Sequence, residues 1–175
     1  MSDTLQIMQL VDQMGRGRSL DDVCRLVIAS RAVGHTLDAA SILVCNDDGV
    51  LQERGRHLAP GSPADFSQLE LTFPTPLALA LARPCSSTFP IDASNVLHPD
   101  ISFPLHASGF AGVWMLPLSL SHEPFALFLG FSQSLTKLPT LSRHHEELFS
   151  SALKLAIRHH SWRQGATTHP PRLAS

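Results

Sequence analysis

Two apolar runs separated by a short polar break constrain this sequence more than any other feature. The runs cover residues 112–120 and 125–131, and the break covers residues 121–123. Two apolar runs joined by a few polar residues predict an antiparallel hairpin. Each run is too short for a membrane-spanning helix, and the break is too polar to lie inside one.

The second run should present apolar side chains on both of its faces, because side chains alternate along a strand. One face is expected to carry Phe125, Leu127, Leu129 and Phe131, and the other Ala126, Phe128 and Gly130. A strand that is apolar on both faces belongs in the middle of a sheet that is covered on both sides. The small residues Ala126 and Gly130 indicate a face that another element approaches closely.

The overall composition fits one cytoplasmic domain with tails, since the chain has 175 residues and 43% of them are hydrophobic. A formal net charge of −2 gives no sign of a nucleic-acid-binding domain. Three cysteines, an odd number at wide spacing, argue against a disulfide framework. The N-terminus has no signal-peptide pattern, and no apolar run is long enough to cross a membrane.

Periodicity and turn residues predict the remaining elements. Helices are expected over 4–15 and from Ser19 to Val33, where Gly34 ends the second one. Strands are expected over 41–45, 50–56, 69–73 and 85–88, and a helix from Thr75-Pro76 to Arg83-Pro84. Residues 89–108 contain three prolines and show no period, which is typical of a functional or mobile connection.

A long final helix is expected to begin at Thr140 or Ser142 and to carry two apolar stripes. We expect the first stripe to cover the sheet, and it comprises Leu141, Leu148, Ala152 and Leu155. The second stripe comprises Phe149, Leu153 and Ile157, and we expect it to meet a second copy of the chain alongside helix 4–15. Residues 1–164 are therefore expected to form one domain and 165–175 a linker.

The order of these elements resembles the GAF domain family over about residues 5–162. The matching segments are SILVCNDDGVLQ, PLALALARPCSS, SGFAGVWMLPLSL, EPFALFLGF and EELFSSALKLAI, and Pro117-Leu118 is the most characteristic pair. The resemblance implies an α+β fold with a central antiparallel sheet. The N- and C-terminal helices would cover one face, and a short helix plus a loop would cover the other.

The resemblance also implies a sensory module that binds a small molecule between the sheet and the covering loop, or that only dimerises. The tail THPPRLAS is similar to the linker that precedes the helix-turn-helix domain of LuxR-type regulators. We therefore expect the sensor of a bacterial transcriptional regulator, acting as a homodimer through its terminal helices. DNA would be bound only by an output domain beyond this sequence. No catalytic motif stands out, so no enzyme activity is expected.

A ligand site is expected where the long connection meets the sheet. Its candidate residues are Cys45, Asp92, His98, Phe103, His106, Phe110 and Trp114. The aromatic residues could enclose a planar ligand, while the histidines and Asp92 fix its polar groups. The alternative interpretation of these residues is an ordinary core beneath a solvated loop. The identity of a ligand or cofactor is unknown from the sequence.

Three alternatives to this sensor remain. The first is a dimerisation module without a ligand. The second is an iron or haem sensor that uses His98, Asp100 and His106, although Val113 and Trp114 stand where the iron-containing GAF relatives would place a cysteine. The third is a thiol enzyme that uses Cys85 beside Arg83. Bilin-binding relatives need a cysteine in the covering loop, and residues 89–108 contain none.

Overall fold

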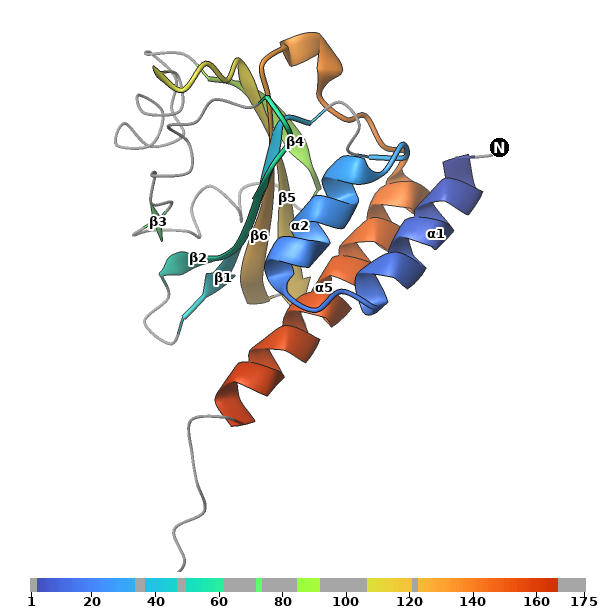
Figure 1. The fold of residues 1–175 in the computed structure, drawn as a ribbon, viewed down its shortest axis with the longest axis vertical. Coiled ribbons are helices and arrows are strands. Elements are labelled where there is room, and N and C mark those ends of the chain that lie inside the picture. Colours follow the sequence, from blue (N-terminus) through green and yellow to red (C-terminus); the bar gives the residue numbers. More distant parts are fainter. Residues whose placement is uncertain are drawn as a thin grey trace, which may run out of the picture.

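A six-stranded antiparallel sheet with helices on one side forms the framework of the chain (Figure 1). The computed structural model describes residues 3–33, 37–46, 50–61, 72–73, 85–91, 107–120 and 123–166. The strands are β1 (Ala39–Cys45), β2 (Leu51–Leu58), β3 (Thr72–Phe73), β4 (Ser87–Pro90), β5 (Gly112–Leu120) and β6 (Glu123–Ser132). The helices are α1 (Asp3–Gly15), α2 (Leu20–Ala29) and α5 (Arg143–Ala166), with a 3₁₀ turn at Leu135–Lys137.

The apolar hairpin lies inside this sheet, as its sequence predicts. The strand order is β3-β2-β1-β6-β5-β4, so that β6 pairs with β5 on one side and with β1 on the other. The α+β fold with a central antiparallel sheet is thereby confirmed. No helix in the described ranges is both long and apolar enough to span a membrane.

Each face of the sheet carries its own apolar cluster, and we name the two faces by what covers them. The helix face packs against α1, α2 and α5, and its strand residues are Ala40, Ile42, Trp114, Leu116, Leu118, Ala126 and Phe128. The opposite face carries Ala39, Leu43, Leu51, Val113, Met115, Leu127, Leu129 and Phe131. The predicted alternation of β6 is confirmed from Ala126 to Phe131.

Phe125 is an exception to the predicted alternation. The register of β5 and β6 shifts between Leu118 and Ser119, which leaves Phe125 as an extra residue on β6. A bulge of one residue reverses the side on which a side chain emerges. Phe125 therefore packs against the helix-face cluster, so the expectation that it shares a face with Leu127 is wrong.

The second helix begins where the sequence predicts but ends earlier. Ser19 caps α2 by accepting a hydrogen bond from the backbone N–H of Asp22 at 3.1 Å. The helix ends at Ala29, because Ser30 has an extended backbone and turns follow. The expectation that the helix reaches Val33 is wrong, although Val33 is buried as predicted.

The apolar stripe by which the final helix packs on the sheet is the second stripe, which the sequence analysis assigns to a second copy of the chain. Ser142 caps α5, with its Oγ 3.3 Å from the backbone nitrogen of His145. Phe149, Leu153 and Ile157 are fully buried, whereas the side chain of Leu155 is 68% exposed. The assignment of the two stripes is therefore wrong. Bulky residues at i, i+4 and i+8 fill the sheet contact, and the small Ala152 and Ala156 lie toward α1 in the groove that the two helices share.

Some predictions fall outside the described residues. They include the helix from Thr75-Pro76 to Arg83-Pro84, most of strand 69–73 and most of the long connection 89–108. The predicted linker 165–175 begins inside α5, since this helix continues to Ala166. The linker prediction is otherwise not tested.

Candidate functional site

The opposite face of the sheet is the candidate site, because α1, α2 and α5 already fill the helix face. Its centre is an apolar surface formed by side chains of β1, β5 and β6, and Ile91 and Phe110 lie against it from the adjoining segments. The ring of Phe110 is 1% exposed, and its centroid lies 5.5 Å from that of Phe131. The buried side chains of this apolar cluster are at most 4% exposed.

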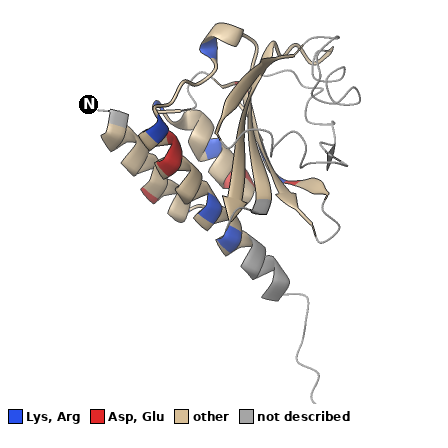
Figure 2. Ribbon diagram, turned by 180° about the vertical axis from the view of Figure 1, so that it is seen from behind, with Lys and Arg blue, Asp and Glu red and all other residues tan. Residues whose placement is uncertain are grey.

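The charged residues of the sheet lie on one strand near its edge. In the described strands, the charged residues are Glu53, Arg54 and Arg56 of β2, together with Glu123 at the very start of β6. Figure 2 shows the middle of the sheet in tan and most of the charged positions on the helices and connections. Among the described strands, a charged group on the opposite face therefore comes from β2.

Two of these charged residues join a serine on the opposite face, and we call Ser41, Glu53 and Arg56 the β2 cluster. The Glu53 carboxylate accepts hydrogen bonds from Ser41 Oγ and from Arg56 Nε, the latter at 2.8 Å. Arg56 Nη2 donates to the second oxygen of the same carboxylate. Ser41 is fully buried, and the side chains of Glu53 and Arg56 are 18% and 15% exposed. The β2 cluster is a partly desolvated ion pair beside an apolar surface.

The β2 cluster was missed by the sequence analysis, although the sequence contains a signal for it. Gly55 interrupts the polar run of β2, and a glycine inside a strand often marks a bulge. The register with β1 shifts between Ile42 and Leu43, so that Leu43 lies opposite Glu53 and Ile42 opposite Gly55. Arg54 is the extra residue.

Of the site residues predicted from the sequence, the structure brings two to the opposite face and separates a third from them. Phe110 lies on that face, and the half-buried Cys45 lies at its margin at the end of β1. Trp114 lies on the helix face, where its ring stacks on Phe149 with centroids 5.9 Å apart. The expectation that Trp114 encloses a ligand together with Phe110 is therefore wrong. Asp92, His98, Phe103 and His106 lie outside the described residues.

The three thiols differ in their surroundings. Cys24 is fully buried on α2, and burial raises the pKa of its thiol well above the usual value. Cys85 is exposed, and the next residue, Ser86, donates two hydrogen bonds to the carboxylate of Glu146. Arg83, the base expected beside Cys85, lies outside the described residues. The hypothesis of a thiol enzyme stays a prediction.

A metal site is likewise not tested by the described part of the chain. Within it, His, Cys, Asp and Glu side chains form no group of three or more that could hold a metal ion. The residues suggested for iron or haem, His98, Asp100 and His106, are not among the described ones.

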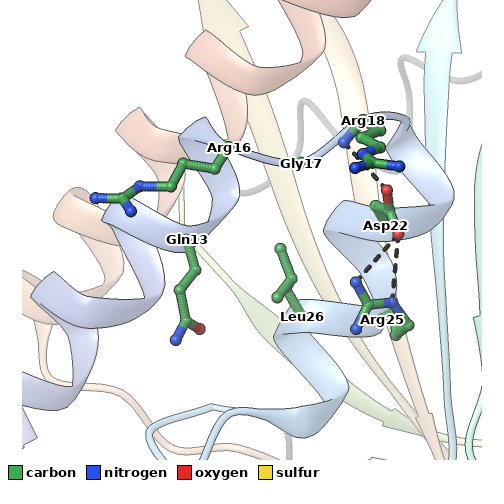
Figure 3. A pocket seen from close by; sticks show the side chains of 7 residues that line it. All are labelled: Gln13, Arg16, Gly17, Arg18, Asp22, Arg25 and Leu26. Atoms are coloured by element: carbon green, nitrogen blue, oxygen red, sulfur yellow. Dashed lines mark hydrogen bonds and ion pairs between the residues drawn. The ribbon is translucent and has the colours of Figure 1, made fainter.

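A hollow lies at the connection between α1 and α2 and has a volume of about 530 Å³ (Figure 3). Its lining comprises Gln13, Arg16, Gly17, Arg18, Asp22, Arg25 and Leu26. Asp22 accepts hydrogen bonds from the backbone N–H of Arg18 and from the Arg25 guanidinium, which together lower the pKa of its carboxyl group. Arg16 is paired with Asp12 at 2.8 Å. These contacts neutralise much of the positive charge and fix the turn between the helices, so we assign this hollow a structural role.

Another hollow, of about 320 Å³, lies between α1 and α5. It is lined by Val11, Met14, Gly15, Ala152, Leu155, Ala156, His159 and His160. Thr4 and His145 are hydrogen-bonded at 3.1 Å near the first turns of the two helices, which run in the same direction. Leu5 and Met8 continue the apolar surface along α1 and are 45% and 59% exposed.

Comparison with known proteins finds similarity in structure and none in sequence. No protein-family model matches the chain, and no curated protein matches it. The phycoerythrobilin-bound GAF domain of a cyanobacterial phytochrome superposes with a TM-score of 0.58 at 16% identity, covering 94% of this chain and 98% of that domain. The GAF domain of a phosphoenolpyruvate-protein phosphotransferase from Coxiella burnetii superposes with a TM-score of 0.59 at 17% identity, covering 94% and 99%.

The chromophore-binding domain of the bacteriophytochrome RpBphP3 from R. palustris gives a TM-score of 0.60 at 10% identity. This match covers 92% of the chain and 62% of that structure. Identities this low establish the arrangement of helices and strands and nothing about the ligand. The chain has the fold of a GAF domain.

Proposed function

We infer that this chain is a ligand-responsive sensor domain that binds a small molecule on the opposite face of its sheet. One observation carries the proposal. The two faces of the sheet differ, since three helices fill one of them, while the other combines an apolar surface with the partly buried ion pair of the β2 cluster. Apolar walls with a few placed polar groups are typical of small-molecule sites.

The structural neighbours support the binding of a small molecule without identifying it. Two of them carry bilins, phycoerythrobilin in one and phycocyanobilin in the other. A bilin is not part of the proposal, because residues 89–108 offer no cysteine for its attachment. We assign no catalytic step to the chain, and its response would be a change passed on to an output domain.

A homodimer formed through α1 and α5 completes the proposed sensor. Its support is the apolar surface of Leu5, Met8 and Leu155, which are the large apolar side chains exposed on the described helices. The hollow between α1 and α5 continues that surface. Isolated exposed apolar side chains are common, but a continuous strip along two neighbouring helices indicates a contact surface.

The output would be transcriptional. This part of the proposal rests on the similarity of THPPRLAS to linkers in LuxR-type regulators. The DNA-binding domain would follow α5, so that the helix which packs on the sheet would also lead to the output.

A thermal-shift screen tests ligand binding. The compounds are central metabolites, flavins, haem, ferrous iron and cyclic dinucleotides. A ligand at 100 times its Kd should stabilise the domain by about 2.7 kcal/mol, which raises Tm by several degrees. A screen in which no compound raises Tm would favour the ligand-free dimerisation module.

Analytical ultracentrifugation tests the dimer. Leu155→Glu places a charge in the proposed contact and should give a monomer with an unchanged Tm. Leu135→Glu is the matched control, because Leu135 is also exposed, at 49%, but lies on the 3₁₀ turn and not on α1 or α5. A wild-type protein that sediments as a monomer at high micromolar concentration would contradict the dimer.

A further inference from the structure

A small hollow lies between α5 and the second half of β5, and we call it the α5–β5 hollow. Its volume is about 210 Å³. Sites for drug-sized ligands usually have volumes of about 300–1,000 Å³, so this one suits a smaller molecule. The hollow lies at the margin of the sheet, because β4 pairs with β5 only as far as Met115, and no other described strand pairs with that edge of β5.

One end of the hollow is fixed by a contact between α5 and the segment before β4. The Glu146 carboxylate accepts hydrogen bonds from the backbone N–H of Ser86, at 2.8 Å, and from the Ser86 hydroxyl. On the side of the sheet, Leu116 and Pro117 line the hollow with apolar atoms. The shape of the hollow is therefore set by secondary-structure elements, as in a preformed site.

Ser150 gives the hollow a buried hydroxyl that lacks a partner. Its side chain lines the hollow and is 8% exposed. It makes no hydrogen bond within the described part of the chain, whereas the buried Ser41 and Ser132 both do. A buried hydroxyl is normally hydrogen-bonded, in a helix often to the carbonyl four residues earlier. A molecule in the hollow would supply the partner that Ser150 lacks.

The charges along the same side of α5 indicate what that molecule is. Lys154 lines the hollow and is half-buried, and it has no hydrogen bond or ion pair with any described residue. Glu147 also lines the hollow, and it lies about two turns before Lys154 on the same side, so that their backbones are about 10 Å apart. Glu147 is paired with Arg143, but the Arg143 side chain is 94% exposed, and such a pair contributes little.

We propose that the α5–β5 hollow binds a small zwitterionic molecule of the amino-acid class. Its carboxylate contacts Lys154 and the Ser150 hydroxyl, and its ammonium group faces Glu147. Its carbon chain lies against Leu116 and Pro117. Water could satisfy Ser150, but a zwitterion also supplies an anion for Lys154 and a cation for Glu147. This site goes beyond the proposed function and does not rest on it.

Three compounds with the same carbon chain test the proposal. γ-Aminobutyrate carries both charges at neutral pH, butyrate carries only the carboxylate, and butylamine carries only the ammonium group. NMR correlation spectra of the isotope-labelled chain follow each titration through its backbone amides. γ-Aminobutyrate should shift the signals of residues 147–154 and 116–119 saturably. Butyrate and butylamine should bind about tenfold more weakly or less, because each lacks one charged contact.

Substitutions of α5 test the named contacts. Lys154→Met should weaken binding of γ-aminobutyrate by about tenfold or more. Lys137→Met is the matched control, because Lys137 is the other lysine of the chain and lies on the 3₁₀ turn outside the hollow. It should change the affinity by less than about twofold. Ser150→Ala should weaken binding by about three- to tenfold. Alanine is a good helix former, so this variant should fold, and its thermal unfolding curve checks this.

Three results would overturn the inference. If none of the compounds shifts these signals saturably, the hollow holds only water. If butyrate or butylamine binds as tightly as γ-aminobutyrate, the site does not recognise both charges. If Lys154→Met binds γ-aminobutyrate as the Lys137→Met control does, the assigned contact is wrong. The proposed function would stand in each case, because it concerns the opposite face and is tested by its own screen.

Discussion

The contact between α2 and the bulged strand leads to a prediction that can be worked out from distances. In Gly55→Ala the new Cβ would lie 2.5 Å from Leu20 Cβ and 2.7 Å from its carbonyl carbon. These atoms belong to the helix backbone and its first side-chain carbon, so a rotamer change cannot relieve the clash. The N-terminus of α2 must therefore move away from β2.

The expected cost has two parts. Forcing extra atoms into a packed contact costs about 1–3 kcal/mol. Moving Leu20 also weakens the 2.7 Å hydrogen bond between Arg56 and the adjacent Asp21, and bonds to charged groups contribute about 1.5–3 kcal/mol when fully formed. Replacing a strand glycine recovers about 0.5–1 kcal/mol of chain entropy. We expect a net loss of about 2–4 kcal/mol in the free energy of unfolding.

Urea denaturation with linear extrapolation measures this loss. Gly15→Ala is the control, because a Cβ at Gly15 would have no atom within 4 Å, and its stability should be unchanged or slightly raised. Gly130→Ala should fall between the two, since the nearest atoms are the methyl groups of Leu37, at 2.7 and 3.0 Å, which can rotate away. If Gly55→Ala is as stable as Gly15→Ala, the close contact between α2 and the bulge is refuted.

Two further predictions concern the helix layer. Trp114→Ala should destabilise the domain by about 3–5 kcal/mol, because the ring is 1% exposed and packs between Phe128 and Phe149. Urea denaturation followed by near-UV circular dichroism measures this loss, and a loss of less than about 1 kcal/mol would place the ring elsewhere. Asp22→Asn should lower the free energy of unfolding at neutral pH. The difference in stability between wild type and variant should be fully present above the unfolded-state pKa of about 3.9, and it should disappear as the pH falls through the lower folded-state pKa of Asp22. Urea denaturation between pH 7 and pH 2.5 measures the effect, and a difference independent of pH would show that the carboxylate charge is not its source.

The sequence is sufficient for the fold because its strongest patterns are local. The alternation from Ala126 to Phe131, the Ser19 cap and the apolar residues of α1 each depend on neighbours a few residues away. The final helix shows where local patterns fail. It carries two apolar stripes, and only the shape of the sheet and the presence of α1 decide that Phe149 faces inward and Leu155 outward.

The candidate site is less accessible to sequence analysis for a related reason. Phe110 and Trp114 are separated by an even number of positions, so a continuous strand would place their side chains on the same face. β5 begins only at Gly112, and Gly109, directly before Phe110, has a φ of +84°, so Phe110 belongs to the turn that leads into β5 and not to the strand. The β2 cluster depends on a bulge that Gly55 signals in the sequence, but the position of the bulge follows from pairing with β1, which the strand alone does not reveal.

The length of α5 has a mechanical consequence. The helix has 24 residues, which corresponds to about 36 Å at the usual rise per residue. Among the residues whose side chains are described, Ile157 is the last residue of α5 in the helix-face cluster, and Figure 1 shows the last turns running past the edge of the sheet. From Leu153, in the middle of the sheet contact, the end of the helix at Ala166 is about 20 Å away, so a rotation of about 5° around this contact would displace the far end by about 2 Å.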